Sequence, residues 1–154
     1  MLTLILPSEL STRIKKALRN AGSREVGGIL MAEHVGAETF LFSELSIHRR
    51  GTFASFVRRV EDALGFIRAF FRVKNHDYTR FNYIGEWHSH PSFAPLPSAT
   101  DDASMREIIT DKDVGANFVV LLIVKLDRDG ELCASAHSYL PDGSKLSARL
   151  QLSK

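Results

Sequence analysis

The sequence predicts a single α/β domain in which helices flank a mixed β-sheet. Three observations support this prediction. The chain has 154 residues, a length that suits one hydrophobic core. Short apolar runs with strand character alternate along the chain with stretches of helical periodicity. No repeat, linker or low-complexity segment interrupts this alternation, so one domain is expected over residues 1–154.

The N-terminal third predicts one helix between strands. The apolar start MLTLIL predicts a strand, and residues 7–21 have helical periodicity. Ser8 is the expected N-cap of this helix, and Gly22 is expected to end it. The apolar stripe of the helix comprises Leu10, Ile14, Ala17, Leu18 and Ala21.

Two strands and a second helix are expected next. Residues 24–33 (REVGGILMAE) predict a buried strand whose glycines allow another backbone to approach closely. Residues 37–47 predict a second strand, paired with the first through a turn near Gly36. Helical periodicity returns over residues 60–73.

The second half of the chain alternates in the same way. Residues 82–90 have strand propensity, and the prolines that follow predict a stiff loop. A helix is expected from about Ser98 to Thr110. Residues 118–126 and 131–140 then predict a hairpin around the turn Asp-Arg-Asp-Gly.

Composition excludes several classes of protein. Hydrophobic residues make up 44% of the chain and charged residues 25%, as in ordinary soluble proteins. The best apolar run, Phe118–Val124, is too short to cross a membrane, and the N-terminus lacks the features of a signal peptide. A net charge of +2 gives no reason to expect nucleic-acid binding. The single Cys133 excludes an internal disulfide and a cysteine-rich zinc site, and a cytoplasmic location is predicted.

The stretch GEWHSHPSFAPLPSATDD, residues 85–102, contains the candidate metal-binding residues. His88 and His90 are two positions apart on a predicted strand, so both imidazoles face the same side, about 7 Å apart at Cα. A zinc site in a hydrolase needs a third protein ligand, and the proline-stiffened loop can deliver Asp101. Ser98 and Asp101 also suit a helix N-terminus, with serine as the cap. The two explanations are compatible, because a helix start is a rigid place from which to direct a ligand.

The same residues resemble the signature of the JAMM metalloprotease family, also called MPN+. The family pattern H-x-H-P, six residues, then S-x-x-D is matched by His88, His90, Pro91, Ser98 and Asp101. An upstream glutamate before a glycine and apolar residues is matched by the stretch that begins at Glu25 (EVGGIL). The resemblance implies a single-domain MPN fold with cytidine-deaminase-like layering over nearly the whole chain. The phrase GEWHSHP is most similar to the prokaryotic branch, whose members occur beside ubiquitin-like proteins and their activating enzymes, some in antiphage systems.

The resemblance also implies a mechanism. One Zn²⁺ per chain would be held by His88, His90 and Asp101, with a fourth position for water. Glu25 would act as general base, and Ser98 would donate a hydrogen bond to the oxyanion. Glu86 is a rival base or a partner for a histidine, because it faces the same side of the strand as the two imidazoles.

The function expected from the resemblance is a zinc-dependent isopeptidase that cuts after the C-terminus of a ubiquitin-like protein. Such a protein or its conjugates would be the substrate, and activating or conjugating enzymes of the same system are further candidate partners. The substrate tail could add a strand to an exposed sheet edge, and region 48–80 is a candidate for substrate recognition. No nucleic-acid or membrane partner is expected.

Two alternatives remain. The chain could be a metallopeptidase that processes a sulfur-carrier protein or short peptides; one relative in this class is associated with DNA repair. That relative typically has asparagine where this chain has Ser89, which counts against it. A non-catalytic MPN scaffold is disfavoured, because every ligand position is filled. Trp87 and Cys133 are expected in the core, and surface or hydrogen-bonded roles are expected for His34, His48, His76 and His137.

Overall fold

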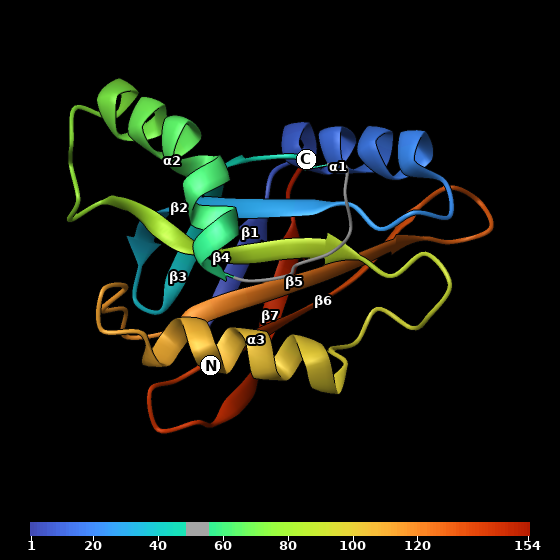
Figure 1. The fold of residues 1–154 in the computed structure, drawn as a ribbon. Coiled ribbons are helices and arrows are strands. Elements are labelled where there is room, and N and C mark those ends of the chain that lie inside the picture. The colour runs from blue at the N-terminus through green and yellow to red at the C-terminus, as the bar shows by residue number, and fades with distance from the viewer. Residues whose placement is uncertain (49–55) are drawn as a thin grey trace.

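The fold is mixed α/β, as predicted. The computed structural model describes residues 1–48 and 56–154, and the side chains of residues 1–48 and 64–154. Seven strands and three helices lie in this described part (Figure 1). They are β1 (Thr3–Leu6), α1 (Ser8–Ala21), β2 (Gly27–Gly36), β3 (Thr39–Leu45), α2 (Phe56–Val73), β4 (Phe81–Ser89), α3 (Ala99–Thr110), β5 (Val119–Leu126), β6 (Leu132–Tyr139) and β7 (Lys145–Leu152).

The strands form a closed ring in the order β1-β3-β2-β4-β5-β6-β7, with β7 pairing back onto β1. Pairing is parallel between β1 and β3, between β1 and β7 and between β4 and β5, and it is antiparallel elsewhere. Each described strand therefore has a partner on both sides. Within this described ring, part of β6 is paired on one side only, because its pairing with β7 begins at Ala136, so the addition of a substrate tail to a sheet edge stays a prediction.

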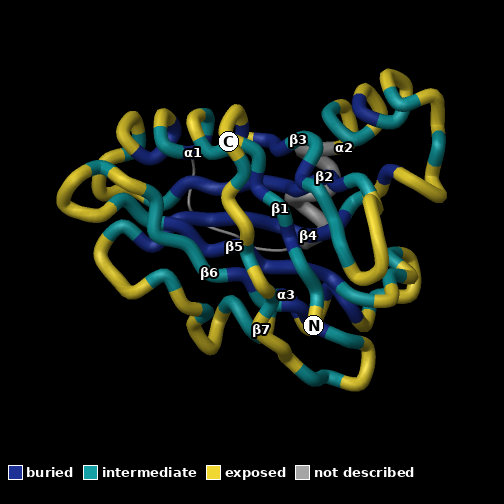
Figure 2. The backbone as a smooth tube through the Cα atoms, turned by 180° about the vertical axis from the view of Figure 1, so that it is seen from behind, coloured by how far each residue is buried: buried dark blue, intermediate teal, exposed yellow. Residues whose placement is uncertain are grey.

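Three apolar clusters hold the helices to the ring. The largest fills the ring interior and includes the buried stripe of α1, which contacts both β3 and β5. A second cluster joins α3 to the outer face of β5 and β6, and a third joins α2 to β2 and β4. Figure 2 shows the buried positions concentrated along the central strands. Trp87 is fully buried in the ring interior, as expected, and its Nε1–H donates to the Ser46 carbonyl at 2.9 Å.

Two glycines allow neighbouring backbones to meet. A Cβ at Gly28 would lie 2.0 Å from the Ser46 carbonyl oxygen, which confirms the predicted close approach. A Cβ at Gly85 would lie 1.9 Å from the Val120 carbonyl oxygen, and Gly85 has a φ of +157° that side chains rarely adopt. Gly85 lies at a β-bulge, where the register between β2 and β4 shifts by one residue.

Several boundary predictions need correction. Ser8 is not the cap of α1, because Ser8 is already helical and the extended Pro7 occupies the N-cap without a side-chain hydrogen bond. The helix α2 begins at Phe56, four residues before the predicted start at 60. The strand β7 was not predicted. Cys133 is half-buried rather than fully buried.

The predicted end of α1 is confirmed. Gly22 ends α1, and its N–H bonds to the Leu18 carbonyl at 3.0 Å. Residues 49–55 of the proposed recognition region lie outside the described part of the chain. None of the described helices is both long and apolar enough to cross a membrane.

Candidate metal centre

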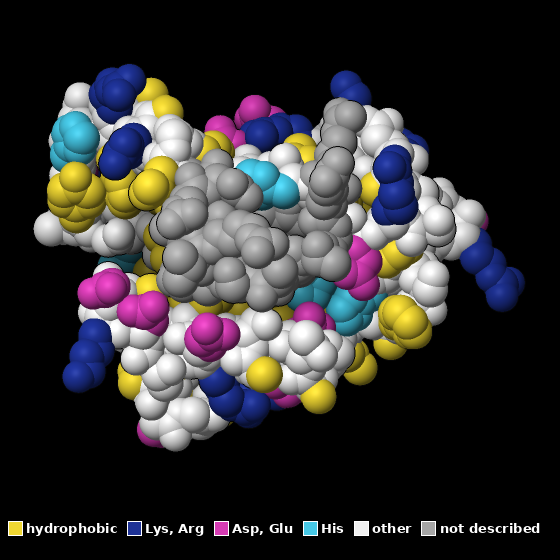
Figure 3. Space-filling view, viewed as in Figure 1, with side chains coloured by type: hydrophobic (Ala, Val, Ile, Leu, Met, Phe, Trp, Pro, Cys, Tyr) yellow, Lys and Arg dark blue, Asp and Glu magenta, His cyan; other side chains and the backbone are white. Residues whose placement is uncertain are grey.

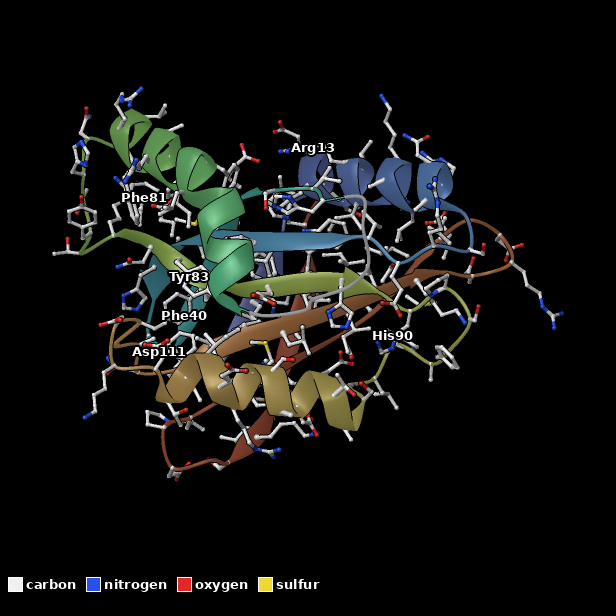
Figure 4. All side chains as sticks on the ribbon, viewed as in Figure 1. Arg13, Phe40, Phe81, Tyr83, His90 and Asp111 are labelled. Atoms are coloured by element: carbon white, nitrogen blue, oxygen red, sulfur yellow. The ribbon has the colours of Figure 1, made fainter. Side chains whose placement is uncertain are left out.

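The two histidines of the motif lie together at the C-terminal end of β4. Their side chains share one face of the strand, as the spacing predicts, and His88 and His90 are only 4% and 7% exposed. Their Nε2 atoms are 3.2 Å apart. In Figure 4, His90 lies between the end of β4 and the start of α3.

Asp101, in the first turn of α3, completes the group. Its Oδ1 lies 3.2 Å from Nε2 of His88, and its Oδ2 lies 3.2 Å from Nε2 of His90. Zinc bound tetrahedrally at about 2.0–2.1 Å places neighbouring ligand atoms about 3.3 Å apart. The three side chains therefore have the spacing that a small divalent ion requires. Among the described residues, no other group of three histidine, cysteine or acidic side chains has this geometry.

The loop between the histidines and α3 orients one imidazole. Nδ1 of His90 lies 3.0 Å from the carbonyl oxygen of Ala94. A carbonyl can only accept a hydrogen bond, so Nδ1 is the donor, which leaves Nε2 as the nitrogen that could bind a metal ion. This arrangement is typical of histidine ligands, whose other nitrogen donates to a carbonyl or carboxylate.

The helix cap and the ligand position are combined at Asp101. The Ser98 hydroxyl accepts from the Asp101 amide at 3.1 Å, and the Asp101 carboxylate accepts from the Ser98 amide at 2.7 Å, which forms a capping box. Burial on its own raises the pKa of the Asp101 carboxyl, but hydrogen bonds with His88 and with the Ser98 amide together lower it well below its ordinary value. Asp101 is therefore an anion at neutral pH, as a metal ligand must be.

The three side chains open into a pocket of about 520 Å³. Glu25, Glu86 and Ser98 also line it, so the structure brings together every site residue that the sequence predicts. In Figure 3, histidine and acidic side chains gather at the surface near the end of β4 and the start of α3. The rest of the pocket lining is Phe93, Ala94, Leu96, Thr100, Ser104, Met105 and Leu121.

The two glutamates differ in setting. Glu25 is half-buried and lies just before β2, whereas Glu86 is 2% exposed within β4. Glu25 was expected on the strand itself, and it lies two residues before the strand begins at Gly27.

Sequence reasoning missed the supports of the proline loop. The carbonyl of Ala94 holds His90, and the hydroxyl of Ser135 on β6 donates to the carbonyl of Pro95. Backbone carbonyls leave no signal in the sequence. Ser135 could have been noticed as a polar residue in the second strand of the predicted hairpin, but nothing in the sequence shows that this strand lies beside the proline loop.

Comparison with known proteins assigns the chain to a family. The sequence pattern of the family described as "Prokaryotic homologs of the JAB domain" matches residues 7–138. The chain belongs to this family. A curated relative from Enterobacter hormaechei subsp. hoffmannii (strain UCI 50), named CD-NTase/cGAS isopeptidase, is 28% identical over 145 residues. That alignment covers 92% of this chain and 77% of the relative.

A solved structure extends the comparison of the fold. The solution structure of a Desulfitobacterium hafniense protein superimposes with a TM-score of 0.66 at 17% identity. The match covers 98% of this chain and 93% of the other. At this identity the likeness concerns the fold alone. Membership of the JAB family and the name of the curated relative support a hydrolase of the isopeptidase kind.

Proposed function

We propose that this JAB-family chain is a zinc-dependent isopeptidase that hydrolyses the bond after the C-terminus of a ubiquitin-like protein. The observation that carries the proposal is the convergence of two imidazole nitrogens and one carboxylate, all 3.2 Å apart, in a pocket that also contains Glu25. The relative named isopeptidase supports the reaction class.

His88, His90 and Asp101 would hold one Zn²⁺. Two neutral imidazoles and one carboxylate are a common ligand set for catalytic zinc, and Cys133, the single cysteine, is elsewhere on β6. When bound, the ion supplies Lewis acidity, which polarises a carbonyl and makes water acidic enough to react at neutral pH.

Glu25 is assigned the proton transfers. It would accept a proton from the attacking water and later deliver it to the leaving amine, so that the amine departs neutral. Its half-buried position at the rim of the pocket gives it access to both solvent and substrate. Glu86 is more deeply buried, in the same row of side chains as the histidines, which suits a supporting role better than proton exchange with substrate.

Ser98 is assigned the oxyanion. Its hydroxyl oxygen accepts from the Asp101 amide, which leaves the hydroxyl hydrogen able to donate into the pocket. A donor held by the first turn of α3 needs no rearrangement as negative charge develops on the carbonyl oxygen.

The substrate is proposed from the family and the curated relative. A ubiquitin-like protein would enter by its tail, joined either to a lysine or to a C-terminal extension. The chain would then act in a bacterial conjugation or antiphage system, in the cytoplasm, alongside the activating and conjugating enzymes of that system.

The deciding experiment uses bacterial ubiquitin-like proteins that carry a reporter peptide behind the C-terminal tail. The zinc-loaded chain should release the reporter, a chelator should abolish release, and added zinc should restore it. Cleavage of short peptides but of no ubiquitin-like fusion or lysine conjugate would contradict the proposed substrate and favour general peptide processing. A folded chain that binds no zinc would contradict the proposed chemistry.

A further inference from the structure

The residue between the two histidines has contacts that neither the proposed ligands nor the proposed proton transfers explain. Ser89 is 1% exposed, and it points to the opposite face of β4 from His88 and His90. Its hydroxyl accepts a hydrogen bond from the amide of Val26 at 3.0 Å. Its own amide donates to the carbonyl of Val26 at 2.8 Å.

One of these two bonds is a regular bond of the sheet ladder, and the other replaces its regular counterpart. Gly27 on β2 is paired with His88 on β4, so Val26 and Ser89 are the next residues opposite each other. In a regular antiparallel pair the amide of Val26 would donate to the carbonyl of Ser89. Here the side-chain hydroxyl takes that place. The segment before β2 is thus held at the end of the ladder by one backbone bond and one side-chain bond.

Glu25 is the next residue along this segment, and it reaches the metal pocket from a position outside any strand. The clamp at Val26 is therefore the fixed point that follows Glu25, and the bond from the Arg24 amide to the Ala21 carbonyl at 3.1 Å holds the backbone before it. We propose that Ser89 is a positioning residue that holds the backbone at Val26 and thereby fixes the Glu25 carboxylate over the metal ligands. This proposal rests on the role proposed for Glu25. It implies that one strand places the two histidine ligands with one face and the proton acceptor with the other.

The test compares the zinc-loaded wild-type chain with Ser89→Ala. The variant should bind zinc within about 3-fold of wild type, because no ligand atom is touched. The Val26 amide, deprived of its buried acceptor, should exchange with solvent at least about 10-fold faster. In a crystal structure of the zinc-loaded variant, the Glu25 carboxylate should be displaced or disordered. With a fusion substrate, kcat should fall about 10- to 100-fold with little change in KM.

Four controls separate positioning from simple loss of structure. Ser89→Thr keeps the hydroxyl and should restore the exchange rate and kcat, and Ser89→Cys, with a weak acceptor, should be intermediate. Ser138→Ala removes another buried hydroxyl, which donates to the backbone carbonyl of Leu146, and this variant should leave the exchange rate and kcat unchanged. In a Glu25→Gln background, Ser89→Ala should lower kcat no further, because a residue that acts through Glu25 has nothing left to position.

Specific results would overturn the inference. Unchanged Val26 exchange and an unmoved Glu25 in Ser89→Ala would show that the hydroxyl holds nothing. A zinc affinity that falls as far as kcat would place the role of Ser89 at the ligands instead. If wild type cuts no substrate, the proposed function fails, while amide exchange and the position of Glu25 still decide whether Ser89 anchors the segment.

Discussion

Two pockets of similar size lie at opposite ends of β4, and only one has the geometry of a metal site. The pocket at the C-terminal end of the strand measures about 520 Å³, and the one at the N-terminal end, lined by His34, Arg80 and Asn82 among others, about 550 Å³. Figure 4 shows His90 at one end and Phe81, Tyr83 and Phe40 toward the other.

The polar groups of the two pockets are used differently. In the N-terminal pocket, His34 stacks on Phe40 with ring centroids 4.8 Å apart, and Arg80 pairs with Glu33 at 2.6 Å. In the C-terminal pocket, three potential ligand atoms face one another across a gap of ion size. Volume and the presence of a histidine are thus poor indicators of a metal site, and convergence of ligand atoms from separate elements is the informative feature.

The largest expected effect comes from matched histidine substitutions, one in each pocket. His88→Ala should weaken zinc binding by more than about 100-fold, because it removes a ligand rather than a support. His34→Ala should leave zinc binding unchanged. Metal analysis and competition titration measure both, and equal zinc content in the two variants would place the ion elsewhere.

The two glutamates of the metal pocket can be ranked by kinetics. Glu25→Gln should lower kcat about 10²- to 10⁴-fold while zinc stays bound, since it removes the proton acceptor and retains the shape of the side chain. Glu86→Gln should reduce kcat less. Turnover by Glu25→Gln at the wild-type rate would transfer the role of base to Glu86.

The loop that leads to Asp101, the third candidate ligand, should depend on Ser135. Ser135→Ala frees the carbonyl of Pro95, next to the Ala94 carbonyl that orients His90. Zinc affinity should fall about 10-fold as the loop loosens. Ser138→Ala, on the same strand, is the control, and an equal loss in both variants would argue against a specific support.

The smallest expected effect concerns Asp102, the residue that follows Asp101 in α3. Burial raises the pKa of Asp102, but hydrogen bonds from Tyr139 and Lys145 outweigh it, so the folded pKa lies below the ordinary value. A lowered pKa stabilises the fold above the unfolded carboxyl value of about 3.9, and this contribution is lost as the pH falls through the folded pKa. Asp102→Asn should cost about 1 kcal/mol at pH 7 and less at pH 3.

Denaturant unfolding of wild type and Asp102→Asn at the two pH values provides the measurement. A stability difference that does not shrink at pH 3 would show that the charge of Asp102 is not what stabilises the fold. Zinc affinity at pH 7 should stay close to wild type, because Asp102 is not among the three converging side chains.

The sequence predicted which side chains gather in the candidate metal pocket better than it predicted the contacts that hold the surrounding elements together. The spacing of His88 and His90 defines a shared strand face, and Ser98 and Asp101 define a helix start, so each local rule points to the same place. These are short-range patterns, in which the positions of a few residues fix geometry. The bonds that bring the elements together were much less visible.

What the sequence did not reveal depends on contacts between distant segments. The strand β7 alternates apolar residues at 146, 148, 150 and 152, and this signal could have been used, but its parallel pairing with β1 joins opposite ends of the chain. Ser89 is a polar residue on a face that otherwise points into the apolar ring interior. A buried hydroxyl there predicts a hydrogen-bond partner without telling which one.

The bulge at Gly85 matters for any attempt to transplant the metal centre into another protein. Ile84 and Trp87 are three positions apart, yet both face the ring interior, which an uninterrupted strand does not permit. A graft of residues 81–90 would retain this one-residue shift in the alternation of side chains between the two faces of the strand. If the bulge were removed while the first residues of the strand kept their orientation, both imidazoles would point into the apolar interior of the host protein.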